Sequence, residues 1–221
     1  MAHLRKHLAV VSCLVLALAF ALALSAAEPK KITAAAGTTP PTHVPEPEAI
    51  LLSESFETSV PPAGWTLQGT HTGTETWYQE SYDPYDGSYY ASVQYDPQLI
   101  PQDEWLVSPA FNLAAAGGTV SLWSNGSVYW CRDTFDNCDL DIYLVVGAIG
   151  GGDDILLGTA DAQWPESWTW VQSTYDIATH LPVNAGVGLH YTGTDGAQVN
   201  VDLVVLDGTL VPVELQRISI E

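Results

Sequence analysis

The sequence has 221 residues, with 26 acidic side chains against 6 Lys and Arg, which gives a formal net charge of −20 at pH 7. Such a polyanion repels nucleic acids and anionic membrane surfaces, and its few cations are too sparse to follow a phosphate backbone. We therefore exclude nucleic-acid binding. The same charge favours solubility and attracts divalent cations.

The chain begins like an export signal. Arg5 and Lys6 precede an apolar run over residues 8–24, and small residues follow at 25–27. We expect residues 1–27 to be a signal peptide, so that the protein is secreted, outside the cell or at its surface, and meets the membrane only through this segment. The alternative is a retained anchor, because the run is short against the roughly 20 residues that span a bilayer.

The next boundaries follow from composition. Residues 28–49 are rich in Pro and Thr and offer little to bury, which indicates an extended linker. Residues 50–208 carry short apolar or alternating runs separated by Gly, Pro, Asp and Asn, which predicts one domain with its own core. Residues 209–221 are either a last strand or a C-terminal tail.

The apolar pattern of the domain is that of strands. Val199, Val201, Leu203 and Val205 alternate with Asn200, Asp202 and Val204, so Asp202 should point away from the face that Val201 buries. No window has the 3.6-residue stripe of a helix with capping residues at its ends. The sequence therefore predicts an all-β, two-sheet antiparallel sandwich. Further strands are expected in residues 88–95, 119–124, 140–146, 168–175 and 185–192.

Two cysteines remain after the signal, Cys131 and Cys138. An oxidising compartment favours a disulfide between them. Closing so short a loop would contribute roughly 2 to 3 kcal/mol in the chain-entropy model. The alternative is a metal site, but two sulfurs without a neighbouring His make a poor zinc set.

Signals for catalysis are weak. There is no Gly-x-Ser-x-Gly elbow, and His71, His180 and His190 stand singly without metal-ligand spacing. The acids include no pair that stands out for glycoside hydrolysis. We expect a non-enzymatic protein.

Acidic loops suggest calcium, which prefers carboxylate and carbonyl oxygens. Residues 83–88, 133–141 and 153–154 are the three candidate stretches, and none matches the twelve-residue helix-loop-helix calcium motif. The alternative for each is a solvated acidic turn.

Several short motifs then occur in an order that resembles the cleaved-adhesin or choice-of-anchor domains of secreted bacterial proteins. These are jelly-roll modules, similar to MAM domains and to calcium-binding carbohydrate modules. The resemblance covers residues 53–208. Its motifs are at residues 54–58, 61–65, 77, 86–91 and 103–113, of which the run beginning Trp105-Leu106-Val107-Ser108-Pro109 is the most specific.

The resemblance implies a two-sheet antiparallel jelly roll with a structural calcium ion. Its ligands would be Glu57 in the first strand, the carbonyl of Ser88 in the Gly-Ser turn, and Asp202 in the last strand. That strand usually carries paired acids in the family, whereas apolar residues flank Asp202 here. The alternative is that Glu57 and Asp202 are surface acids.

Two functions are compatible with these observations. The first is a secreted adhesion or binding module whose partner is an extracellular protein or another copy of itself. The second is a carbohydrate-binding module for polysaccharide, because exposed aromatic rings stack on sugars; Trp77, Trp130 and Trp168 are the candidate ligand-binding residues. A hydrolase is a third, less favoured reading.

Overall fold

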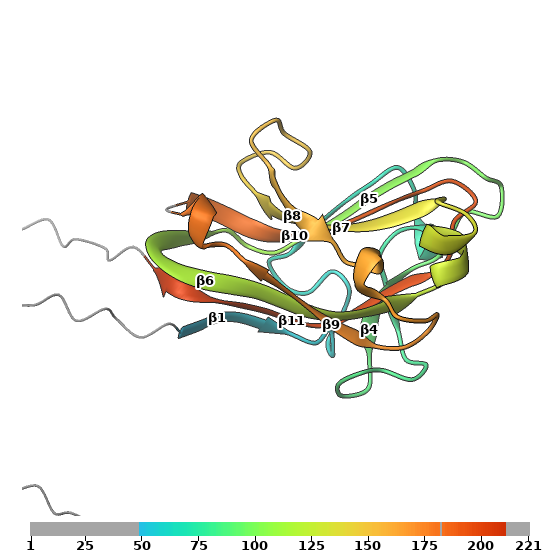
Figure 1. Ribbon diagram of the computed structural model, residues 1–221, viewed down its shortest axis with the longest axis horizontal. Coiled ribbons are helices and arrows are strands. Elements are labelled where there is room, and N and C mark those ends of the chain that lie inside the picture. The colour runs from blue at the N-terminus through green and yellow to red at the C-terminus, as the bar shows by residue number, and fades with distance from the viewer. Residues whose placement is uncertain (1–48, 182, 211–221) are drawn as a thin grey trace, which may run out of the picture. The chain divides into compact units, whose positions relative to one another are not determined.

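The computed structural model describes residues 49–181 and 183–210 (Figure 1). The predicted signal peptide, nearly all of the linker and residues 211–221 lie outside this range. Ala49 already belongs to the first strand, and the last strand ends at Leu210. The strands are β1 (Ala49–Glu54), β2 (Thr66–Gln68), β3 (Tyr78–Glu80), β4 (Tyr90–Val93), β5 (Gln102–Val107), β6 (Phe111–Gly126), β7 (Cys138–Val145), β8 (Ile155–Thr159), β9 (Val171–Asp176), β10 (Val183–Gly193) and β11 (Val199–Leu210).

These strands form two layers in which every pairing is antiparallel (Figure 1). The first layer has the order β3-β4-β11-β6-β9, and β1 continues beside β11 beyond the end of β4. The second has the order β2-β5-β10-β7-β8. β10 joins them, because its first residues pair with β6 before the rest runs between β5 and β7. The predicted two-sheet antiparallel sandwich is confirmed.

Helical structure is limited to single turns in the described part of the chain. Three of these are 3-10 turns, and one is a π-helical turn, Tyr129–Asp133. No helix in residues 49–181 or 183–210 is long and apolar enough to cross a membrane. The expectation of very little helix is confirmed, because the period-2 pattern dominates throughout.

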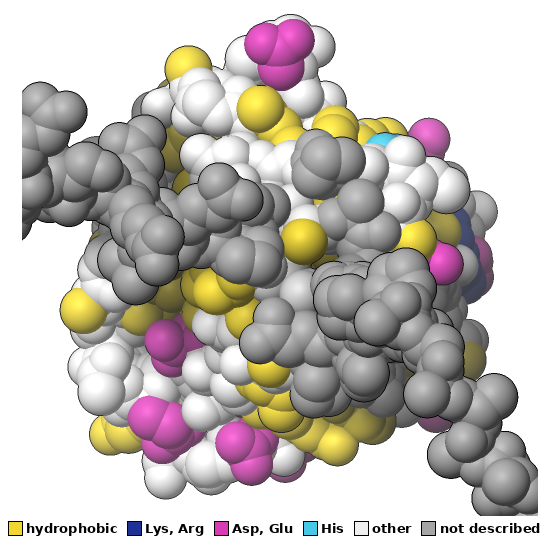
Figure 2. Space-filling view, turned by 90° about the vertical axis from the view of Figure 1, so that its left-hand side faces the viewer, with side chains coloured by type: hydrophobic (Ala, Val, Ile, Leu, Met, Phe, Trp, Pro, Cys, Tyr) yellow, Lys and Arg dark blue, Asp and Glu magenta, His cyan; other side chains and the backbone are white. Residues whose placement is uncertain are grey.

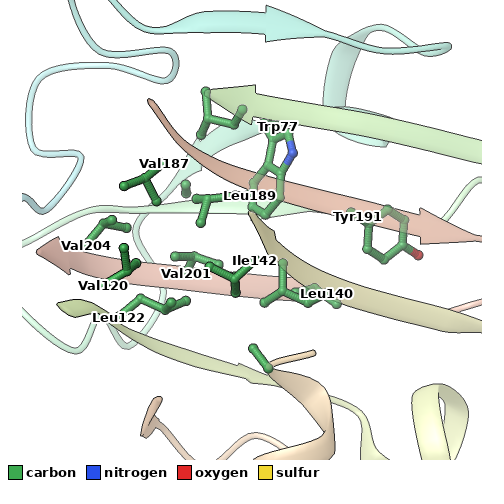
Figure 3. Close-up of a cluster of buried hydrophobic side chains, with 14 of the residues drawn as sticks. Trp77, Val120, Leu122, Leu140, Ile142, Val187, Leu189, Tyr191, Val201 and Val204 are labelled. Carbon is green, nitrogen blue, oxygen red and sulfur yellow. The ribbon is translucent and has the colours of Figure 1, made fainter. Parts of the chain in front are cut away.

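The core lies between the layers and follows from strand alternation (Figure 3). Successive side chains of a strand point to opposite faces, so every second residue is buried. Each fully buried aliphatic side chain contributes on the order of 1.5–3 kcal/mol to the free energy of unfolding. The central layer of this core includes Val120 and Leu122 from β6, Leu140 and Ile142 from β7, Val187, Leu189 and Tyr191 from β10, and Val201 and Val204 from β11.

The predicted disulfide is present. Cys131 in the π-helical turn is bonded to Cys138 at the start of β7, and both side chains are buried. The bond therefore fixes an aromatic turn against the strand that follows it.

Positive charge is scarce on the domain. Arg132 is the one Lys or Arg between residues 49 and 210. Its guanidinium pairs with Asp133 and donates to the carbonyls of Asp161, Ala162 and Trp164. On the face shown in Figure 2, acidic side chains are spread over the surface, while basic atoms occupy a small area at one edge.

Candidate functional site

The outer face of the first layer is polar yet largely covered. Along β11, Val199 and Val201 point into the core, while Asn200 and Asp202 point to the opposite face. The exposed fractions are nevertheless 5% for Asn200 and 0% for Asp202. The cover comes from residues 81–89, where Tyr85 stacks on Trp123 of β6 at a centroid distance of 3.7 Å.

The three residues predicted as calcium ligands lie around one turn. The Glu57 carboxylate accepts hydrogen bonds from the backbone N–H groups of Ser88 and Tyr89, at 2.9 and 3.0 Å. Asp202 accepts one from the N–H of Asp86 at 2.8 Å. Gly87 lies directly against Glu57, because a Cβ at this position would overlap the carboxylate. We call Glu57, Ser88 and Asp202 the acidic clasp.

Asp202 has an unusual environment for a carboxylate. It points away from the core as predicted, but residues 81–89 bury it, and the register of β11 shifts directly after it. Burial raises the pKa of Asp202 to about 6 from an ordinary value of 3.8, and the negative charge of Asp86 adds to the rise. The N–H bonds from Asp86 and Leu203 oppose it without cancelling it. A nearby cation would relieve this cost.

The donor set of the clasp fits calcium in kind. Carboxylate and carbonyl oxygens are the ligands that a hard cation prefers. Both N–H bonds to Glu57 go to its Oε1, which leaves Oε2 as the oxygen that could bind a cation. The clasp supplies two carboxylates. Nowhere among the described residues do three or more His, Cys, Asp or Glu side chains gather in an arrangement able to hold a metal. Backbone carbonyls would therefore have to complete the coordination.

A groove lies on the same outer face. A pocket of about 260 Å³ is lined by Tyr82, Asp83, Tyr90, Asn125, Trp168, Gln198 and Asn200. A second pocket of about 290 Å³ is lined by Tyr95, Trp130, Trp168, Asp195, Gly196, Ala197 and Gln198. The two pockets share Trp168 and Gln198 and therefore adjoin one another. Together we call them the aromatic groove.

The floor of the aromatic groove is a network of side-chain amides. Asn200 donates to Asn125 at 2.7 Å and accepts from Ser92 at 2.8 Å. Gln198 donates to Asn200 and to Ser92, at 2.8 and 3.1 Å. The network fixes the amides in place, and the side-chain oxygen of Gln198 and the Nδ2 of Asn125 take no part in it. These groups are suited to bind a polar ligand.

Backbone strain is concentrated at these two places. Six non-glycine residues of the described chain have positive φ. Trp168, Asp83 and Asp195, with φ of 64°, 57° and 55°, line the groove. Phe56 and Leu203 adjoin Glu57 and Asp202 in the clasp. Left-handed backbone is costly for such residues, and it occurs mostly at functional sites.

The three candidate aromatic residues differ in their exposure to solvent. Trp168 is 53% exposed, and its backbone N–H donates to the carbonyl of Gly126 at 2.8 Å. Trp130 is half-buried in the stapled π-helical turn, stacked on Phe135 at 4.6 Å. Trp77 is 2% exposed, and its indole N–H donates to the carbonyl of Glu104. The prediction of Trp77 as a ligand-binding residue is therefore wrong, because it belongs to the core.

Several groove residues were not predicted. Tyr95, Asn125 and the pair Gln198 and Asn200 come from three separate parts of the chain and carry no motif. One usable signal was the alternation of Gln198, Asn200 and Asp202 with buried valines, which places three polar side chains on one face. The loops that surround these side chains form the walls of the pockets, and strand alternation does not predict where loops lie.

A further buried polar cluster lies elsewhere, around His71. The Oε1 of Glu104 accepts from the N–H and hydroxyl of Thr70 and from the N–H of His71, and it lies 3.0 Å from the His71 ring. Asp96 lies 3.4 Å from the other ring nitrogen. The cluster fixes residues 69–71 against β5, a structural role.

Comparison with known proteins defines the class of fold. No protein-family model and no curated protein sequence matches this chain. Comparison with solved structures shows that the chain has a cleaved-adhesin-like jelly-roll fold. The K1 cleaved adhesin domain of Lys-gingipain from Porphyromonas gingivalis W83 is 19% identical with a TM-score of 0.54, and the match covers 72% of this chain and 98% of that domain.

Two further structures are similar. The K2 cleaved adhesin domain of Lys-gingipain is 16% identical with a TM-score of 0.53, covering 70% of this chain and 98% of that domain. The CBM22-1 xylan-binding domain of Paenibacillus barcinonensis Xyn10C is 15% identical with a TM-score of 0.45, covering 75% and 96% respectively. At these identities the similarity establishes the jelly-roll architecture alone.

Proposed function

We propose that this chain is a secreted, non-catalytic adhesion or binding module, and that the aromatic groove is its ligand site. The single observation that carries the proposal is that two pockets adjoin at Trp168 and Gln198, with Trp168 exposed between them. An exposed tryptophan on strained backbone, above a fixed polar floor, is the type of surface that binds a partner. The fold similarity to adhesin domains supports the same function.

The groove suits binding better than catalysis. The aromatic rings and amides that line it are contact groups, and its two carboxylates, Asp83 and Asp195, are both exposed and belong to different pockets. Acid–base chemistry requires a group whose pKa is adjusted to the reaction and which lies beside the reacting bond. We therefore assign the groove to recognition.

The test compares binding by the full secreted protein and by the variant Trp168→Ala on immobilised glycans and extracellular matrix proteins. We expect a saturable signal with wild type and a loss of at least about tenfold in affinity with the variant, since an exposed aromatic anchor contributes on the order of 1–3 kcal/mol. Leu156→Ala is the control, because Leu156 is 50% exposed on β8 in the other layer. Equal binding by all three proteins would refute the groove as the ligand site.

We further propose that calcium stabilises the acidic clasp, held by Glu57, the Ser88 carbonyl and Asp202. The buried carboxylate of Asp202 and the Oε2 of Glu57 support this. Asp202 accepts from the N–H of Asp86, and Oε2 lies beside Gly87, 2.9 Å from the position of an added Cβ. The ion would supply positive charge to a part of the domain without Lys or Arg, since Arg132 pairs with Asp133 elsewhere. The two carboxylates and the turn would position it.

The calcium proposal is tested by thermal unfolding with calcium and with chelator. Calcium at about a thousand times its dissociation constant adds on the order of 4 kcal/mol, so chelation should lower the Tm by many degrees. Glu57→Gln and Asp202→Asn should lose most of this response. Asp153→Asn, an exposed acid in another loop, should retain it. An unchanged Tm in wild type on chelation would exclude a structural calcium ion.

A further inference from the structure

The chemistry of the aromatic groove identifies the class of ligand. The argument rests on the proposed function, in that it takes the groove to be the ligand site and asks what fits it. Three properties of the groove determine which ligands fit it: the charge of its lining, the polar character of its floor and the presence of two pockets.

Charge excludes acidic ligands. Of the described residues, no Lys, Arg or His lines either pocket, and Asp83 and Asp195 put a carboxylate in each. Arg132 follows the half-buried Trp130 but lines neither pocket, since its guanidinium is engaged by Asp133 and three carbonyls. A sulfated, sialylated or uronic-acid chain would meet only like charge here. The same holds for a phosphorylated or acidic peptide.

The floor excludes a purely apolar ligand. Asn125 and Asn200 are each 5% exposed and hydrogen-bonded to each other, and half-buried Gln198 lies beside them. Covering such a floor with an apolar surface would leave the outward amide groups without partners, which costs more than the contact gains. A ligand rich in hydroxyl groups satisfies both the amides and the two carboxylates, because each hydroxyl donates one hydrogen bond and accepts others.

The position of the floor also disfavours an extended peptide. Asn125 lies on β6 and Asn200 on β11, and these two strands are paired in the interior of the first layer. Their backbone groups are already used in the sheet, so a peptide could not add itself as a further strand. Recognition must then proceed through side chains.

Aromatic rings flank this floor in both pockets. Tyr82 and Trp168 belong to the first pocket, and Tyr95, Trp130 and Trp168 to the second. An aromatic face binds the C–H face of a sugar ring through dispersion and apolar contact, leaving the equatorial hydroxyls free for the polar groups beside it. Since the pockets share Trp168, a chain of sugars crossing it would place successive rings in each.

From these observations we infer that the aromatic groove binds an uncharged glycan chain of several sugar units. Trp168 is the central stacking residue, Gln198 is the hydroxyl-binding residue shared by the two pockets, and Trp130 completes the second pocket. The stapled turn around Trp130 presents its ring with little loss of conformational entropy.

The test is calorimetric titration of the full secreted protein with cello-, manno- and xylo-oligosaccharides of increasing length, and with oligogalacturonides as charged counterparts. We expect binding of a neutral series only, with affinity rising at least about tenfold from disaccharide to the longer chains, as the second pocket is filled. This binding should be insensitive to salt up to about 0.5 M, because no charge is paired.

Four variants separate the roles. Trp168→Ala and Gln198→Ala should each weaken every neutral chain about tenfold or more, while Trp130→Ala should abolish the gain with length and leave the disaccharide unchanged. Asp83→Asn/Asp195→Asn should admit oligogalacturonides without loss of neutral chains, since Asn tolerates left-handed backbone. Unfolding curves of each variant establish that it is folded.

The outcomes are distinct. Groove-dependent binding of oligogalacturonides in preference to neutral chains, or of matrix protein alone, would overturn this inference while leaving the binding module intact. Neutral-chain binding that survives both Trp168→Ala and Gln198→Ala would overturn the groove assignment itself. No binding of any oligosaccharide in the panel would also overturn the inference.

Discussion

The acidic clasp and the aromatic groove are built on the same outer face of the same sheet, yet one is closed and the other open. In the clasp, Glu57 and Asp202 accept N–H bonds from the turn at residues 86–89, so the turn lies directly over the two carboxylates. In the groove, Trp168 and Tyr82 remain exposed above a fixed floor. β11 contributes to both, through Asp202 and Asn200.

This difference separates stability from recognition. A closed polar cluster contributes to the free energy of unfolding and responds to ions and pH. An open aromatic surface contributes little to stability but provides contact area for a partner. Variants in the clasp should therefore change stability, and variants in the groove should change binding. The following predictions test that separation, from the largest expected effect to the smallest.

The pH dependence of stability should distinguish Asp202. Its pKa is raised from 3.8 to about 6 by folding, so the folded state binds the proton more tightly, and stability falls as pH rises between these values. The difference is about 3 kcal/mol for a shift of this size. Urea unfolding in the presence of chelator should show this fall between about pH 3.5 and 6.5, and saturating calcium should remove it.

Asp161 provides the control for this experiment, because burial raises its pKa to about 7. Its contribution to the free energy of unfolding should fall with rising pH in the same direction. Asp161→Asn should leave unchanged the part of the pH dependence of stability that calcium removes, whereas Asp202→Asn should abolish that part. A calcium response of equal size in Asp202→Asn would contradict the assignment.

Removal of the disulfide should lower stability by about 2.5 kcal/mol, the chain-entropy value for so short a loop. The variant Cys131→Ser/Cys138→Ser, measured by urea unfolding, checks this. Because the bond fixes the turn that carries Trp130, ligands that reach the second pocket should also weaken. Ligands confined to the first pocket should bind as before.

Gly87→Ala should open the clasp. Gly87 has a φ of 62°, and an added Cβ would overlap the Glu57 carboxylate. Left-handed backbone alone costs about 1–2 kcal/mol for alanine, so unfolding should become easier by at least that amount. The matched control is Gly152→Ala, where an added Cβ meets nothing within 4 Å. An identical loss of stability in both variants would argue against the clasp.

Calcium should have a small effect on the groove. Residues 81–89 connect the two sites, because Tyr82 and Asp83 line the groove, while the N–H groups of Asp86 and Ser88 donate to the two carboxylates of the clasp. Ordering this segment should raise ligand affinity a few-fold, near the lower limit of typical coupling energies, about 1 kcal/mol. Titrations of the ligand with calcium and with chelator measure it, and Asp202→Asn should bind equally in both.

The strands were predictable because strand alternation is a local property of the sequence. The runs at 119–124 and 185–192 lie within observed strands, and the run at 140–146 does so up to Val145, where β7 ends. Val199 and Val201 are buried as their spacing required, but the register of β11 shifts after Asp202, so that Val204 is buried in place of Leu203 and Val205. The run at 168–175 was only partly correct. β9 begins at Val171. Trp168 precedes this strand, has a left-handed backbone and lines the groove.

The proximity of the three clasp residues was predictable, but the burial of Asp202 was not. Resemblance placed Glu57, Ser88 and Asp202 together, and alternation pointed Asp202 out of the core. The burial of Asp202 depends on a loop more than a hundred residues away in sequence, since its partner Asp86 is separated from it by 116 positions. Such a contact leaves no periodic signal.

The sequence by itself determined the all-β architecture, the one disulfide pairing open to the two cysteines outside the predicted signal segment, and the acidic, cation-poor surface, because each depends on composition or on spacing along one strand. Only the tertiary structure decided which aromatic residues face solvent. Trp77 is buried, whereas Trp168 and Trp130 meet at one groove above Gln198 and Asn200. The physical reason is that a side chain's exposure depends on which loop covers it, and loops are placed by pairings between distant strands.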